Sequence, residues 1–222
     1  MTQQRRTELD EDVFVARILE AGNWLKANQQ AVTIGVVVLV VAVASFLYYR
    51  NYRRSLVEQA ANQLEQIHTQ AAMGDTRGAK DALMLYLDRF GSTPYAGEAR
   101  MLLGEIYLSD GEPEQALATL EPMAESPRDP LELQAAALLA AAYEQDGRWA
   151  DAEATYLRIA DRSELDFQIR DALAAAARIR AAQGNAAGAA ELYRRILAAL
   201  DDDAPERGMW EMRLAELGQV SG

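Results

Sequence analysis

Cysteine is absent from this sequence, and histidine occurs once, as His68. The lack of cysteine excludes disulfides, thiolate nucleophiles and cysteine-based metal sites. A lone histidine without a visible orienting partner is a poor candidate for general-base catalysis. No glycine-rich loop carries the Lys and Ser or Thr that bind phosphate, and no loop has calcium-ligand spacing. We therefore expect a protein that is not an enzyme and that uses no cofactor or metal.

Positive charge is also scarce, because 22 Lys and Arg face 34 Asp and Glu, for a net charge of −12. Residues 1–54 hold seven Lys or Arg against five Asp or Glu, a balance of +2, so the remaining residues carry −14. Such an acidic region repels phosphate groups, which argues against nucleic-acid binding. Basic or unfolded polypeptides are the partners that this charge favours.

Charge is missing altogether from residues 31–49, AVTIGVVVLVVAVASFLYY. These nineteen residues would rise about 28 Å as a helix, which matches the hydrocarbon thickness of a bilayer. Arg50 stops the run, and no small-residue cleavage site follows, so we expect an anchor that is retained rather than a signal peptide. A buried helix of a soluble protein is the alternative, although such a helix rarely lacks a polar face.

Residues 1–30 are predicted to form a polar tail with an amphipathic helix. Phe14, Ile18 and Leu25 lie on a narrow apolar stripe of this helix, and Gly22 interrupts it. One interpretation is an interfacial helix that leads into the membrane span. The other is a docking helix for a partner protein.

Glycine recurs at a regular spacing in the rest of the chain. Gly74, Gly111, Gly147 and Gly184 recur at spacings of 37, 36 and 37, in an alanine-rich sequence without strand alternation. A period of this length indicates a repeat architecture. We expect each glycine to join two helices of one hairpin, in the left-handed conformation that ends a helix.

Residues in register around these glycines resemble the tetratricopeptide repeat, most closely over 97–130 and 133–166. Small residues in both helices of a unit would let the two helices approach closely. Tyr107 and Tyr143 would fill the space between neighbouring units. In the fourth unit, Arg180 stands where an aromatic residue is expected. Prolines are expected to end the second helix of a unit. The small residues are Gly104, Ala140 and Ala177 in the first helices and Ala116, Ala152 and Ala189 in the second, and the prolines are Pro94, Pro127 and Pro130.

The segment from Pro205 predicts a helix that caps the repeats. An apolar stripe would hold it against them, and Pro205 would lie in its first turn. The stripe comprises Met209, Trp210, Leu214 and Leu217. The predicted fold is thus all-α: one transmembrane helix, then a tetratricopeptide-like solenoid of about four helix hairpins and a capping helix, over residues 55–222.

The resemblance to the tetratricopeptide repeat implies that the first helix of each unit lines a concave groove. Carried onto this chain, the groove is small, apolar or acidic, and it lacks the Lys, Arg and Asn set that clamps a C-terminal carboxylate. It suits an extended or partly unfolded polypeptide, unless it is empty or filled by the chain itself. The groove residues are Glu98, Met101, Glu105, Leu108, Gln134, Ala137, Ala141, Glu144, Gln145, Asp171, Ala174 and Arg178.

The stretch DEDVFVARILEAGNWLKANQQAVTIGVVVLVV, followed by an acidic repeat domain, resembles the YfgM-type ancillary subunits of the bacterial Sec translocon. The resemblance implies a single-pass inner-membrane protein with a cytoplasmic N-terminus, periplasmic repeats, and contacts with the translocon and a periplasmic prolyl-isomerase chaperone. More cations follow the span, namely Arg50, Arg53 and Arg54, than closely precede it, namely Arg17 and Lys26. The positive-inside rule therefore favours the opposite orientation, with the repeats in the cytoplasm. The alternative function is an accessory or assembly subunit of another membrane complex.

Overall fold

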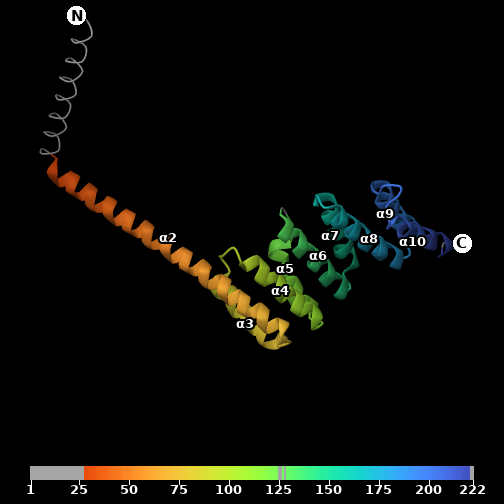
Figure 1. Cartoon of the computed structure of the whole chain (residues 1–222), viewed down its shortest axis with the longest axis horizontal. Coiled ribbons are helices and arrows are strands. Elements are labelled where there is room, and N and C mark those ends of the chain that lie inside the picture. Colours follow the sequence, from red (N-terminus) through yellow and green to blue (C-terminus); the bar gives the residue numbers. More distant parts are fainter. Residues whose placement is uncertain (1–27, 125–126, 128, 221–222) are drawn as a thin grey trace, which may run out of the picture. The chain divides into compact units, whose positions relative to one another are not determined.

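The computed structural model describes residues 28–124, 127 and 129–220, apart from the side chains of residues 32, 219 and 220, and every regular element in these ranges is a helix (Figure 1). The chain divides into two compact units, Met1–Ser55 and Leu56–Gly222. The first described helix, α2, begins in one unit and ends in the other. The helices are α2 (Gln29–Ala72), α3 (Thr76–Phe90), α4 (Ala96–Ser109), α5 (Pro113–Ala124), α6 (Pro130–Gln145), α7 (Trp149–Arg162), α8 (Asp166–Ala182), α9 (Ala186–Ala199) and α10 (Arg207–Val220).

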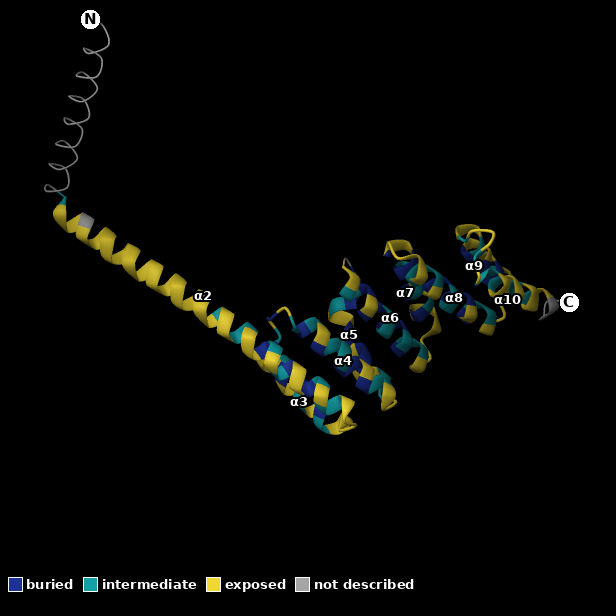
Figure 2. Cartoon of the chain, in the orientation of Figure 1, coloured by how far each residue is buried: buried dark blue, intermediate teal, exposed yellow. Residues whose placement is uncertain are grey.

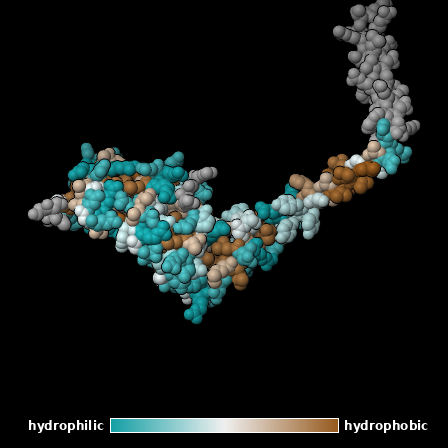
Figure 3. Space-filling view, turned by 180° about the vertical axis from the view of Figure 1, so that it is seen from behind, coloured by the Kyte–Doolittle hydropathy of each residue, from teal (hydrophilic) through white to brown (hydrophobic). Residues whose placement is uncertain are grey.

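The apolar run lies in the first half of α2 and is exposed. Among the described helices, α2 is long and apolar enough to cross a bilayer, judged by length and composition, and none of its most apolar 18-residue window is buried. Figure 2 shows this part of the helix as exposed, and Figure 3 shows apolar side chains gathered along it. The helix continues through Arg50, Arg53 and Arg54 without a break. No described residue buries this run, whereas the alternative of a soluble-core helix predicts burial.

The four periodic glycines form the turns within the helix hairpins, as predicted. Gly74, Gly111, Gly147 and Gly184 have φ values of 89°, 73°, 75° and 80°, and no other described residue has a positive φ. A side chain disfavours this conformation, whereas glycine adopts it freely. Each glycine joins a pair of helices: the end of α2 with α3, α4 with α5, α6 with α7, and α8 with α9.

Small residues hold the two helices of each hairpin close together. Ala116, Ala152 and Ala189 of the second helices are fully buried, as are Ala140 and Ala177 of the first. At Gly104 of α4 the approach is close, because an added Cβ would lie 2.9 Å from the side chain of Leu120. These residues have the packing role that the repeat pattern predicted.

The apolar core of the second unit consists of two clusters of buried residues. One joins α3 and α4 to the last part of α2, and the other runs from α5 to α9. Tyr107 packs against both clusters, so it fills the space between neighbouring units as expected. Stacking therefore buries apolar faces that a single hairpin would leave in water.

The helix α10 closes this stack. Trp210 packs against the core, with its ring centroid 6.1 Å from that of Tyr193, and Leu214 and Leu217 pack beside it. The predicted stripe was wrong at Met209, which is 44% exposed. Pro205 lies in the turn before α10 rather than in its first turn, because the helix begins at Arg207.

The predicted prolines lie in the connections between hairpins or at the start of the next helix. Pro94 lies in the turn between α3 and α4, and Pro127 lies between α5 and α6. Pro130, however, opens α6, where the side chain of Asp129 accepts a hydrogen bond from the Glu132 backbone N–H at 2.9 Å. The expectation that Pro130 ends the preceding helix was therefore wrong: its fixed φ and missing N–H suit a first helical turn equally well.

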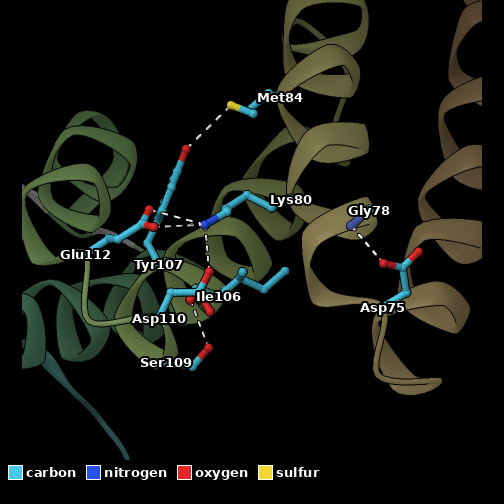
Figure 4. Close-up of polar contacts among 9 residues, drawn as sticks. All are labelled: Asp75, Gly78, Lys80, Met84, Ile106, Tyr107, Ser109, Asp110 and Glu112. Carbon is cyan, nitrogen blue, oxygen red and sulfur yellow. Dashed lines mark hydrogen bonds and ion pairs between the residues drawn. The ribbon is translucent and has the colours of Figure 1, made fainter.

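Lys80 of α3 links the first hairpin to the second (Figure 4). Its Nζ lies 2.6 Å from Asp110 Oδ2 and 3.1 Å from Glu112 Oε1, both in the turn after α4, and 5.3 Å from the ring centroid of Tyr107. The hydrogen bonds to Asp110 and then Glu112 raise the pKa of Lys80. Three attractive contacts therefore converge on one ammonium group at this junction.

The contacts of Arg180 explain why the fourth unit lacks the expected aromatic residue. Arg180 stands four residues before its glycine, as Tyr107 and Tyr143 do, and its Nε donates to Glu153 Oε1 at 2.7 Å. Glu153 stands six residues after the preceding glycine, the same position as Lys80 in the first unit. These two positions are therefore in contact at the first junction, as Lys80 with Tyr107, and at the third, as Glu153 with Arg180.

We expect Arg180→Ala to destabilise the protein by about 2 kcal/mol, because it leaves the largely buried carboxylate of Glu153 without its partner. The equivalent positions of the preceding junction hold Leu117 and Tyr143, which belong to or pack against one apolar cluster. The double substitution Glu153→Leu with Arg180→Tyr should therefore recover all but about 1 kcal/mol of the loss. Urea unfolding of the full chain in detergent measures both.

Arg195 provides the matched control for this cycle. It bonds Asp161 at 2.9 Å across the same junction, but both side chains are at least half exposed. Arg195→Ala should cost less than about 1 kcal/mol. An equal cost at Arg180 and Arg195 would show that burial of the pair is unimportant.

Candidate functional groove

The first helices of three successive units line one groove. Its volume is about 530 Å³, which falls in the range of ligand-binding clefts. Met101 and Glu105 come from α4, Gln134 and Ala137 from α6, and Asp171 from α8. The structure thus brings together residues that the repeat pattern placed on the concave face, and their role in binding remains a prediction.

The other predicted groove residues lie outside this lining, and most of them have partners. Glu98 faces His68 of α2, with 3.1 Å between its Oε1 and His68 Nε2. Arg178 contacts Glu144 at 2.7 Å. The Gln145 amide donates to the Leu108 carbonyl at 3.2 Å. The remaining two, Ala141 and Ala174, are half-buried on α6 and α8.

Several residues that line the groove were missed by the sequence analysis. Phe167 and Gln168 lie in the first turn of α8, and Phe167 is 56% exposed. Phe167 stands seventeen residues before its glycine, where Pro94 and Pro130 stand in earlier units, and this break in the pattern was the available signal. Tyr156 also lines the groove, because it reaches it from the second helix of its unit.

Tyr156 connects the groove to a polar pair. Its hydroxyl donates to Glu144 Oε1 at 2.8 Å, and the Nη2 of Arg178 donates to the same oxygen. Burial, followed by the hydrogen bond to Glu144, raises the pKa of Tyr156. This arrangement holds Tyr156 in place and neutralises Glu144.

The docking helix predicted near the N-terminus receives no structural description. The docking-helix residues Phe14, Ile18 and Leu25 lie outside the described residues. Within the described ranges, no three His, Asp or Glu side chains are grouped so that they could hold a metal ion. The groove is therefore the feature of the repeat unit from which a function can be argued.

Comparisons with known proteins agree with this architecture. The structure is similar to crystal structures of nearly identical TPR-like repeats from a putative kinesin light chain of Podosopora anserina, both the parent protein and a variant with one substitution. Each match has a TM-score of 0.59 and 22% identity, and covers 74% of this chain and 87% of the other, which supports the fold alone. No curated protein matches the chain.

The sequence also matches a family profile over most of its length. The matched family is described as "Tetratricopeptide repeat-like domain", and the match covers residues 22–219. Repeats of this kind are in general non-catalytic scaffolds that bind other proteins. The chain belongs to the tetratricopeptide repeat-like domain family.

Proposed function

We propose that this protein is a non-enzymatic, membrane-anchored adaptor that binds polypeptides at the bacterial Sec translocon and assists their folding or handover. The observation that carries the proposal is the groove across α4, α6 and α8, which combines an exposed aromatic ring, a floor of small residues and polar side chains. A solenoid with such a concave surface is suited to an extended chain. Catalysis plays no part in this role.

The exposed apolar half of α2 supports the membrane anchor. Its Val, Leu, Ile and Phe side chains are about half to two-thirds exposed, and burying them in lipid would remove that surface from water. Arg50, Arg53 and Arg54 follow the run and would lie at the membrane surface. A signal sequence has a similar composition, so retention of the apolar run in the membrane is what distinguishes an anchor.

The resemblance of the N-terminal stretch to YfgM-type subunits supports the translocon as the site of action. On the basis of this resemblance, the proposal includes a cytoplasmic N-terminus and periplasmic repeats at the inner membrane, beside a prolyl-isomerase chaperone. An acidic repeat unit with an open groove suits a partner that receives emerging, partly unfolded chains. Both the location and these partners are part of the proposal.

A photoreactive amino acid in place of Met101 tests the proposal in intact membranes. Met101 is half-buried in the groove, so a crosslink there reports an occupant. We expect crosslinks to newly exported polypeptides or translocon-associated proteins, identified by mass spectrometry. The control is the same substitution at Met212, which is 54% exposed on α10.

Crosslinks from Met101 to this chain alone would contradict the proposal. Crosslinks to one stoichiometric subunit of a different membrane complex would instead favour the accessory-subunit alternative. Equal products from Met101 and Met212 would show that the groove is not the binding site.

A further inference from the structure

The groove contains two carboxylates that no described residue neutralises. Glu105 of α4 and Asp171 of α8 are exposed, and neither forms a hydrogen bond or ion pair with any described residue. In contrast, Glu144 on the same concave face is paired with Arg178 at 2.7 Å. The two free carboxylates lie on the first helices of the units that flank α6, so they border the groove from both sides.

No cation lines the groove among the residues that the structure describes. The chain beyond residue 54 carries −14, so its average field also favours positive charge. A concave site with walls of low polarity concentrates this field. A cationic guest would gain from both effects, and an acidic guest would be repelled.

Apolar groups lie among these carboxylates. Phe167 is 56% exposed in the groove, next along α8 to Gln168 and one turn before Asp171, and Met101 lies across from it on α4. An aromatic ring beside a carboxylate can hold the aliphatic stem of Lys or Arg while the charged head reaches the acid. The ring can equally pack against an apolar side chain.

Two amides in the lining can bind a main chain. Gln134 makes no hydrogen bond with any residue in the described ranges. Gln168 accepts one from Ser163 Oγ at 2.6 Å through its Oε1, which leaves its NH₂ group to donate. Such amides can pair with the carbonyl and N–H groups of an extended peptide.

Resting on the proposed function, we infer that the groove selects extended polypeptide segments in which a Lys or Arg adjoins an aromatic or large aliphatic residue. Glu105 and Asp171 receive the cation, Phe167 and Met101 contact the apolar side chain, and Gln134 and Gln168 bind the backbone. Segments with an acidic residue at the same place are rejected. The occupant is a segment of another protein.

Fluorescence anisotropy with the full chain in detergent micelles tests this selection. The probe is a fluorescein-labelled nine-residue peptide of Ala and Gly with a central Phe-Lys pair, and its matched peptides carry Phe-Glu or Ala-Lys instead. We expect the Phe-Lys peptide to bind about tenfold more tightly than either matched peptide. The Phe-Glu peptide loses the two charge contacts with Glu105 and Asp171, and the Ala-Lys peptide loses the contact of its aromatic ring. Its affinity should fall as salt is added.

Substitutions in the protein locate the effect. Glu105→Gln with Asp171→Asn should weaken the Phe-Lys peptide about tenfold and remove the preference over Phe-Glu. The control is Asp88→Asn with Glu114→Gln, which removes the same charge from exposed positions on α3 and α5 outside the groove. Phe167→Ser should reduce the advantage of Phe-Lys over Ala-Lys. Circular dichroism verifies that each variant is folded.

Equal binding of the Phe-Lys and Phe-Glu peptides would overturn the inference, as would equal losses in the groove and control variants. Failure of all three peptides, together with successful crosslinking at Met101, would overturn the selection rule and leave the adaptor proposal standing. Selective peptide binding with no crosslinked partner at Met101 would reject the proposed function and keep the selection rule.

Discussion

Replacing Leu39 and Val41 with arginine is expected to release the protein from membranes. Both residues lie near the middle of the apolar run and are about 60% exposed in the structure. A charged residue at the centre of a span costs about 3 kcal/mol on insertion scales, so two cost about 6 kcal/mol. We expect the variant to move from the membrane pellet to the supernatant on alkaline carbonate extraction.

Two arginines at the end of the run form the matched control. Asn51→Arg with Tyr52→Arg adds the same charge among Arg50, Arg53 and Arg54, where a span meets water. This variant should remain in the pellet like the parent protein. Retention of the Leu39 and Val41 variant in the pellet would mean that the exposed apolar half of α2 is not the anchor.

The same membranes can show the orientation, because the chain has no cysteine of its own. A single cysteine introduced at Ser221 should react with an impermeant thiol reagent from the periplasmic side, whereas one at Thr2 should not. The reverse pattern would support the positive-inside count instead of the family resemblance.

The second large effect is expected inside the repeats, at Gly104 of α4. Gly104→Leu should destabilise the protein by about 3 kcal/mol or more, because even a Cβ here would lie 2.9 Å from the side chain of Leu120, which is fully buried. The helix α4 would have to shift away from α5. Urea unfolding of the full chain, followed by circular dichroism, measures the loss.

Gly208 distinguishes packing from helix propensity. It lies in α10, and a Cβ at this position would have nothing within 4 Å. Gly208→Leu should therefore be neutral or stabilising by up to about 1 kcal/mol, since leucine favours a helix more than glycine does. Destabilisation of similar size at both positions would show that the α4–α5 approach is not unusually close.

The repeat architecture could be predicted because its signals are local. A left-handed turn needs glycine, and it recurs once per hairpin, so Gly74, Gly111, Gly147 and Gly184 marked the turns before any contact was known. The need for small residues where helices approach marked Gly104 and Ala140 in the same way. Met209 was misplaced because a helical stripe alone does not show which of its edges meets the core.

The groove could be predicted only in part. The register of the first helices placed Met101, Glu105 and Asp171 on one face, and the structure brings them together. Phe167 was not predicted to line the groove, because it stands where earlier units have proline, at the start of a helix. Tyr156 was not predicted to line the groove, because it reaches the groove from α7, the second helix of its unit.

By itself, the sequence determined the helix hairpins, the turns that join them and the apolar run, because each depends on residues close together in the chain. Only the tertiary structure decided which charges remain free. Glu144 meets Arg178, 34 residues away, whereas Glu105 and Asp171 meet no partner among the described residues. Charge pairing across a solenoid depends on how the units stack. The number of residues that separate two opposite charges along the chain does not reveal whether they meet.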